Sequence, residues 1–223
     1  MTGESEGPGT HTFVFADLAG YTALTEAHGD EQAAEAAAEF QDAVRSLLAE
    51  HEAEEVKAMG DALLLRVPDA AKAAGLAERI VCDHGTRHRA LAVRVGMHTG
   101  TAVRRGTDWF GSAVNIASRV ADVARAGEVL CTEATRRAIG PAVPLRERGS
   151  KTFKNVLEPV GLYEFVLASR AGPDLPLDPV CLMGVDRARA VDRRVHGGVE
   201  YHFCSERCSE AFGDAPELYV PRV

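Results

Sequence analysis

The sequence predicts an α+β protein with helices on one face of a mainly antiparallel sheet, followed by a small cysteine-containing module. Three observations support this. Short apolar runs alternate with Ala-rich segments of helical periodicity. Gly-Asp and Thr-Gly pairs lie between apolar runs, as in hairpin turns. A proline-containing stretch over 169–177 then separates the last apolar run from three cysteines near the end of the sequence.

The expected elements follow from apolar spacing and from the turn residues between them. They are a buried strand over 12–16, one long or two consecutive helices over 21–51, a hairpin turning at Gly60-Asp61, a helix over 69–84, a hairpin over 91–105 turning at Thr99-Gly100, helices over 112–126 and 133–139, and strands over 145–154 and 162–167. Hairpins that alternate with helices are typical of an α+β layer.

Composition limits the partners. With 33 acidic and 25 basic residues the net charge is −8, which argues against duplex nucleic acid but not against a nucleotide. No apolar run is long enough to span a membrane, and residues 1–10 resemble a disordered tail, not a signal peptide. We therefore expect a cytoplasmic protein. Five cysteines in such a chain favour metal or free thiols over disulfides.

Two carboxylates follow neighbouring predicted strands. Asp17 ends the first strand and Asp61 sits beside a turn glycine. Each alone has a structural explanation, since aspartate caps helices and favours turns. Together they are the kind of pair with which proteins hold Mg²⁺ beside substrate phosphates.

The helix predicted over 112–126 has an apolar stripe and a separate polar face with Asn115, Arg119 and Asp122. The ordinary interpretation is a solvated face on which Arg119 pairs with Asp122. The functional interpretation is an amide and a forked donor that project into a shared polar site. Lys57 and Lys154 are, by default, solvated lysines.

Residues 11–168 resemble the catalytic domain of class III adenylyl and guanylyl cyclases. The resemblance rests on five ordered segments: FADLAGYT (15–22), KAMGDALLL (57–65), GMHTGTAV (96–103), DWFGSAVNIASR (108–119) and SKTFKNVLEPVGLYEF (150–165). It implies a ferredoxin-like antiparallel sheet with helices packed on it. Five motifs in order are a strong signal, although any one would be weak.

The resemblance also implies roles for particular residues. Asp17 and Asp61 would hold two Mg²⁺ or Mn²⁺ ions. Lys57 and Asp108 would bind the purine, and a lysine donor with an aspartate acceptor matches adenine N1 and the N6 amino group. Guanine presents the opposite pattern, so this pair favours ATP over GTP.

On the same resemblance, Asn115 would orient the ribose, Arg119 would stabilise charge on the α-phosphate, and Lys154 would bind the terminal phosphates. The implied reaction converts ATP to 3′,5′-cyclic AMP and pyrophosphate. In this family the site forms between two subunits, so one chain with the full set implies a homodimer. The alternatives are a guanylate cyclase, or a catalytically silent nucleotide-binding or dimerisation domain in a metal-handling protein.

The C-terminal stretch 178–223 contains DPVC and YHFCSERC, followed by APELY. Ser205 is placed to cap a helix running to Phe212, and the glycines at 197–198 indicate a hairpin turn. So small a unit needs a metal or another staple. It resembles a YHS domain, which suggests Cys181, Cys204 and Cys208 as ligands for zinc or copper(I).

His202 is a candidate fourth ligand of that metal, although a lone histidine in a strand is more often structural. The alternative for the whole module is a docking domain with reduced cysteines. Its fusion to the first domain suggests a further hypothesis, in which the module tunes cyclase output to metal or redox state.

Overall fold

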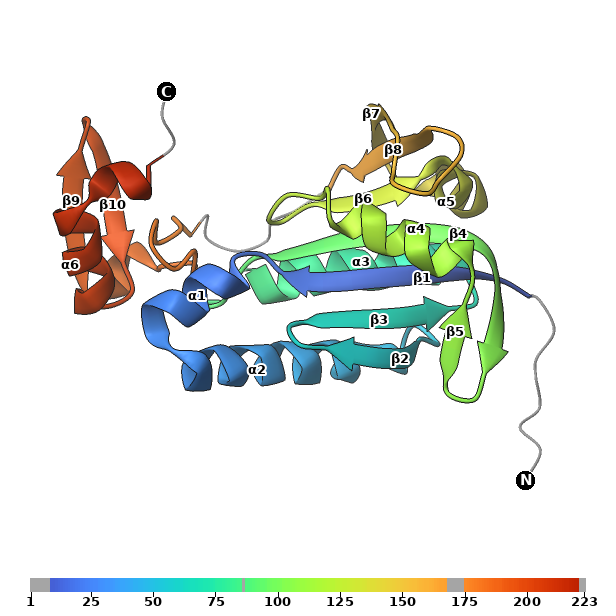
Figure 1. Ribbon diagram of the computed structural model, residues 1–223, viewed down its shortest axis with the longest axis horizontal. Coiled ribbons are helices and arrows are strands. Elements are labelled where there is room, and N and C mark those ends of the chain that lie inside the picture. Colours follow the sequence, from blue (N-terminus) through green and yellow to red (C-terminus); the bar gives the residue numbers. More distant parts are fainter. Residues whose placement is uncertain (1–8, 86, 168–174, 221–223) are drawn as a thin grey trace.

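A computed structural model describes residues 9–85, 87–167 and 175–220 (Figure 1). The first domain consists of β1 (Gly9–Leu18), α1 (Tyr21–His28), α2 (Asp30–Leu48), β2 (Glu54–Met59), β3 (Ala62–Val67), α3 (Ala70–Gly85), β4 (Val93–Arg105), β5 (Asp108–Phe110), α4 (Ser112–Ala121), β6 (Val129–Thr132), α5 (Glu133–Ile139), the 3₁₀ turn η1 (Gly140–Ala142), β7 (Leu145–Lys151) and β8 (Val160–Phe165).

The strands form one sheet in the order β2-β3-β1-β4-β6-β8-β7, and β5 pairs with β4 beside this path. All pairs are antiparallel except β4 with β6, which is parallel. The predicted α+β class is therefore confirmed. The stretch over 21–51 forms two helices, because Gly29 adopts φ 90° and interrupts the helical path.

The prediction of a hairpin over 91–105 was wrong. β4 runs unbroken through Thr99 and Gly100, which pair with Thr12 and His11 of β1. The turn comes later, at Gly106, whose φ is 63°. Gly100 serves another purpose, because a Cβ there would lie 3.0 Å from the Ala113 side chain of α4.

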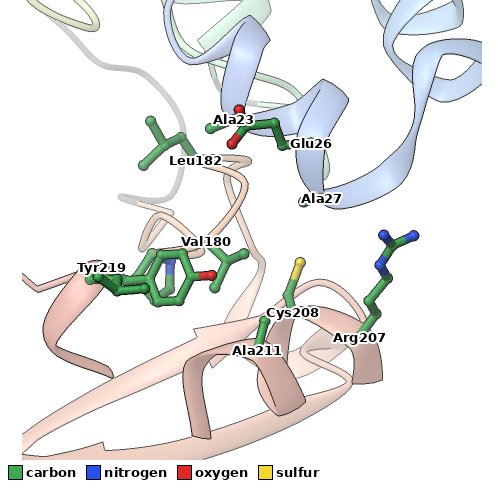
Figure 2. A pocket seen from close by; sticks show the side chains of 11 residues that line it. Ala23, Glu26, Ala27, Val180, Leu182, Arg207, Cys208, Ala211 and Tyr219 are labelled. Atoms are coloured by element: carbon green, nitrogen blue, oxygen red, sulfur yellow. The ribbon is translucent and has the colours of Figure 1, made fainter. Parts of the chain in front are cut away.

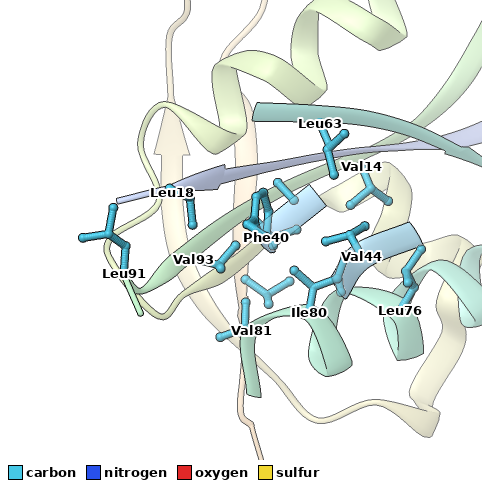
Figure 3. Packing of buried hydrophobic residues seen from close by; sticks show 14 of the residues in the cluster. Val14, Leu18, Phe40, Val44, Leu63, Leu76, Ile80, Val81, Leu91 and Val93 are labelled. Atoms are coloured by element: carbon cyan, nitrogen blue, oxygen red, sulfur yellow. The ribbon is translucent and has the colours of Figure 1, made fainter. Parts of the chain in front are cut away.

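Helices cover both faces of the sheet, not one as the sequence predicted. Successive strand residues point to opposite faces. On β1, Val14 packs on the side of α2 and α3, whereas Phe13 joins α4 on the other side. Figure 3 shows the first of these layers, with Phe40 of α2 and Ile80 of α3 packed beneath the strands.

Small residues bring α4 against β4. A Cβ on Gly96 would lie 2.0 Å from the backbone nitrogen of Ala121 and 2.7 Å from the carbonyl oxygen of Ala117. No side chain fits in that space. The helix ends at Ala121, five residues before the predicted end at 126.

The C-terminal module contains η2 (Arg187–Arg189), the hairpin β9 (Asp192–His196) and β10 (Val199–Phe203), α6 (Glu206–Asp214) and η3 (Pro216–Leu218). The predicted turn is confirmed at Gly197 and Gly198, both with positive φ. The predicted cap is also confirmed, since the Ser205 hydroxyl accepts a hydrogen bond from the Cys208 amide at 3.2 Å.

The module packs against the first domain beside α1, at the end of the sheet where β1 finishes (Figure 1). Its apolar residues join the main hydrophobic core, among them Cys181, Met183 and Phe203. The Arg89 amide donates to the Gly184 carbonyl at 2.8 Å, and the Gly184 amide donates to Ala90 at 2.9 Å. The first domain therefore completes a core that the module is too small to build alone.

The predicted boundaries are described only in part. Residues 1–8 of the tail predicted over 1–10, and residues 169–174 of the linker predicted over 169–177, lie outside the described residues. Gly9 and Thr10 begin β1, and Leu177 forms a β-bridge with Gly184. Within the described ranges, no helix has both the length and the apolar character that crossing a membrane requires.

Candidate functional site

Asp17 and Asp61 meet at one end of the sheet. The register pairs Asp17 with Ala62, which places Asp61 of the β2–β3 turn beside it. Burial, and then the charge of Asp17, raise the pKa of Asp61 to about 6. Two partly buried carboxylates repel each other, and a divalent cation would relieve that repulsion. The pair therefore fits a magnesium or manganese site.

Arg94 is a charged neighbour that the sequence analysis missed. It lies directly opposite Asp17 on β4, and its Nε donates to Asp17 Oδ2 at 2.7 Å. A second contact from the same guanidinium falls on that oxygen too. The available signal was an arginine between two buried valines, Val93 and Val95, at the start of an apolar strand.

Lys57 and Asp108 lie together where β2 meets β5. The Lys57 ammonium donates to Asp108 Oδ2 at 2.6 Å, and the Trp109 amide donates to Asp108 Oδ1 at 2.8 Å. The hydrogen bond from Lys57 is the main reason that the pKa of Asp108 lies below its ordinary value. The structure thus brings together the two residues assigned to base recognition.

Asn115, Arg119 and Lys154 line one open cavity of about 520 Å³ between α4 and the segment 154–158. Arg119 also lies 3.8 Å from Asp122, so the predicted helix-surface pair forms, but loosely and in solvent. Neither Asp17 nor Asp61 lines this cavity. One chain therefore presents the carboxylate pair and this polar group as separate sites.

Asn155, next to Lys154, adopts φ 63°. This left-handed conformation suits glycine best and asparagine among the few other residues that tolerate it. Asn155 can therefore adopt the backbone conformation that the turn after Lys154 requires.

The three cysteines of the module converge in its interior. Cys204 Sγ lies 3.4 Å from Cys181 Sγ and 3.9 Å from Cys208 Sγ, and all three residues are buried. Hydrogen bonds from the other two thiols lower the pKa of Cys208, while that of Cys181 is raised. Asp178 holds two of the loops by accepting from the amides of Val180 and Cys204, each at 2.9 Å.

The fourth member of this cluster comes from the first domain. His28, the last residue of α1, places Nε2 at 3.4 Å from Cys204 Sγ and 3.3 Å from Cys208 Sγ. The four donor atoms lie within 4.8 Å of one another. His202 does not join them, and its Nε2 instead lies 3.4 Å from Glu200. His202 was therefore the wrong candidate for this position.

A cavity of about 400 Å³ separates α1 from the module (Figure 2). Glu26 and Ala27 of α1 line one side, and Leu182 and Arg207 of the module line the other. Figure 2 shows the Cys208 sulfur pointing from α6 toward α1. This cavity thus borders the buried cysteine cluster at Cys208.

Comparison with known proteins agrees with this architecture. Residues 4–157 match the adenylate and guanylate cyclase catalytic domain, and residues 177–223 match the YHS domain. A pH-sensitive adenylate cyclase of Mycobacterium tuberculosis is 39% identical over 131 residues, covering 59% of this chain and 33% of that protein. An adenylate cyclase of Streptomyces griseus is 37% identical over 116 residues, covering 52% of this chain and 29% of that protein.

The chain belongs to the adenylate and guanylate cyclase catalytic domain family and has a C-terminal YHS domain. Among solved structures, an adenylate cyclase of Trypanosoma brucei in its monomeric state superposes with a TM-score of 0.67 at 24% identity. The superposition covers 72% of this chain and 90% of that one, and it shows the shared fold. The chain spans about a third of the length of the two curated relatives above.

Proposed function

We propose that this protein is an adenylate cyclase that converts ATP to 3′,5′-cyclic AMP and pyrophosphate. The observation that carries the proposal is the Lys57–Asp108 pair, a donor and an acceptor held 2.6 Å apart in a cyclase domain. Lysine can donate to adenine N1 while aspartate accepts from the N6 amino group. Guanine offers an N1 donor and an O6 acceptor instead, which this pair matches poorly.

The polar cavity on α4 supplies the rest of the nucleotide contacts in this proposal. Asn115 orients the ribose, Arg119 meets the charge that develops on the α-phosphate, and Lys154 binds the terminal phosphates. The ribose 3′-oxygen attacks the α-phosphorus in line as the bond to the leaving pyrophosphate breaks. The proton of the 3′-hydroxyl passes to solvent, and positioning with charge stabilisation accounts for most of the catalysis.

Asp17 and Asp61 would hold two Mg²⁺ or Mn²⁺ ions in this account. Burial, and then the charge of Asp17, raise the pKa of Asp61, which supports a cation between the two carboxylates. The ions would supply two kinds of chemistry, a more acidic 3′-hydroxyl and a neutralised leaving group. Arg94 keeps Asp17 in place by binding one of its two oxygens.

The active unit is proposed to be a homodimer, with each site built from both chains. The carboxylate pair and the α4 cavity are separate on one chain, so a second copy would bring them together. Exposed apolar side chains lie next to the polar group. Phe110 is 52% exposed beside Asp108 and Trp109, and Leu157 in the cavity wall is fully exposed. Such residues are typical of interaction surfaces when they cluster.

The test is to incubate purified protein with ATP or GTP and Mn²⁺ or Mg²⁺ and to identify cyclic nucleotides by mass. Cyclic AMP from the wild type, with none from Asp61→Ala, would support the proposal. Cyclic GMP in place of cyclic AMP would favour a guanylate cyclase. No product from a well-folded dimer would favour a silent nucleotide-binding or dimerisation domain in a metal-handling protein.

A second proposal concerns the module, in which Cys181, Cys204 and Cys208 would bind zinc or copper(I). Three sulfurs that converge in a buried space, with no disulfide among the five cysteines, support it. Free thiols also suit a reducing compartment, and we therefore propose a cytoplasmic location. Because the chain is acidic, we propose that it has no nucleic-acid partner.

A further inference from the structure

We infer that the cyclase domain supplies the fourth ligand of the C-terminal metal site, through His28, so that one zinc ion joins the two domains. This inference does not depend on the cyclase activity proposed above. The site is shared between helix α1 of the catalytic domain and two parts of the module, the loop of Cys181 and the β10–α6 segment that carries Cys204 and Cys208.

The donor geometry suits zinc. Zinc binds sulfur at about 2.3 Å and imidazole nitrogen at about 2.0 Å, so tetrahedral geometry places donor atoms about 3.5–3.8 Å apart. The contacts among His28, Cys181, Cys204 and Cys208 include four separations between 3.3 and 3.9 Å. Three thiolates with one imidazole is a common structural zinc set.

The surroundings hold these donors in place before any ion arrives. Asp178 ties the loop of Cys181 to Cys204 through backbone hydrogen bonds, and the Ser205 cap fixes the first turn that carries Cys208. Three thiol groups gathered in one buried space, with an imidazole against two of them, are better matched to a cation than to one another. The cavity between α1 and the module borders this site at Cys208.

A second contact joins the module to the beginning of the same helix. Leu182, which follows Cys181, packs on Gly20 so closely that a Cβ there would lie 2.8 Å from Leu182 Cδ1. Gly20 precedes α1 with φ 95°, and Asp17 lies three residues earlier. The Ala19 amide between them is held by the Ala92 carbonyl at 2.8 Å.

The module therefore touches α1 at both ends, at Gly20 through Leu182 and at His28 through the cysteines. Zinc would convert the second of these contacts into coordinate bonds. Loading would then restrict α1 and the short segment that joins it to Asp17. If the proposed cyclase function holds, this makes the metal in the module a regulator of the catalytic metal site.

The first test measures zinc binding by the full chain. Chelator competition should give one zinc per chain for wild type, and His28→Ala should weaken binding by more than about tenfold, the least that loss of even an outer-shell partner typically costs. His196→Ala, an exposed histidine of the same module, is the matched control and should bind as wild type does. X-ray absorption should show three sulfurs and one imidazole, with the imidazole lost in His28→Ala.

The second test follows amide hydrogen exchange of the full chain with and without zinc. Residues 20–28 should exchange more slowly in zinc-loaded wild type and in His196→Ala, but not in His28→Ala. The inference would be overturned if His28→Ala bound zinc as tightly as wild type. It would also be overturned if zinc binding did not change hydrogen exchange of α1 in wild type. Neither measurement depends on turnover. A failed cyclase assay would therefore not affect the test of the zinc site.

Discussion

Lys57 and Asp108 form an ion pair with a 2.6 Å contact between the β2 strand and the short β5 strand. Both side chains are about one-third exposed, so they remain within reach of a ligand. The hydrogen bond from Lys57 lowers the pKa of Asp108, and the contact holds both side chains in one place. The pair is therefore prepared to bind a base that offers one acceptor and one donor at neighbouring positions.

This arrangement predicts which nucleotide the protein prefers. Replacing the pair by Lys57→Glu with Asp108→Asn would provide an acceptor for guanine N1–H and a donor to O6. Each of the two matched hydrogen-bonding pairs contributes about 1–3 kcal/mol of discrimination, so the ratio of kcat/KM for ATP over GTP should fall by at least about 30-fold. If the double variant, measured with both substrates, still preferred ATP as strongly as wild type, other groups would be shown to select the base.

The raised pKa of Asp61 predicts how stability depends on pH in the absence of divalent cations. Its pKa is about 6 in the folded protein and near the ordinary 3.8 when unfolded, so between these values the folded state binds more protons. Stability should therefore fall as pH rises from about 4 to about 6. In Asp61→Asn this component is absent, so the variant should gain in Tm relative to wild type across that window. If Tm depended on pH in the same way in both proteins, the raised pKa of Asp61 would be contradicted. Asp214→Asn, which changes an exposed aspartate, is the control.

Gly96 predicts a large steric effect at the α4–β4 contact. In Gly96→Ala the new methyl would lie 2.0 Å from the backbone nitrogen of Ala121, a clash that α4 can avoid only by moving away. We expect a loss of at least about 3 kcal/mol, the upper end for overpacking. That loss corresponds to a fall in Tm of about 6–12 °C for a chain of this size.

Gly75→Ala is the matched control for that substitution. Gly75 lies inside α3, and a Cβ there would make only ordinary contact with His51 at 3.5 Å. Alanine in a helix interior is favoured over glycine by about 0.5–1 kcal/mol, so Tm should rise slightly. A comparable loss in both variants would show that the effect at Gly96 is not the close approach of α4.

Zinc removal should destabilise the whole chain, because the bound ion stabilises only the folded, docked state. At free zinc of about 100 times Kd the stabilisation is about 2.7 kcal/mol, which should appear as a higher Tm for the loaded protein. In His28→Ala the difference in Tm between the loaded and chelated protein should shrink at the same zinc concentration. An equal difference in both proteins would place the ion's effect on the module alone.

Local sequence patterns predicted most of the elements but could not resolve those that depend on packing. Thr99-Gly100 has the composition of a turn, yet Gly100 is extended and pairs with His11 of β1, and its missing side chain leaves room for Ala113 of α4. Phe13 and Val14 of β1 point to opposite faces of the sheet, and both are buried. This is explained only by helices on both sides of the sheet.

The candidate site divides in the same way. Motif positions predicted that Lys57 and Asp108 belong together, and the structure places them in contact. His28 could not be found from the sequence, because it lies 176 residues from Cys204 and only the docking of the two domains brings them together. The same holds for Arg94, whose role depends on its register opposite Asp17.

The central claim is that one chain carries two incomplete halves of an active site and that a second copy completes it. Asp17→Ala removes the carboxylate half and Asn115→Ala removes the α4 half, so each variant alone should be inactive. Mixing the two and verifying heterodimers should restore activity at one of the two sites, up to about half the wild-type rate per dimer. Verified heterodimers that form no cyclic AMP, beside an active wild-type dimer, would contradict the shared site.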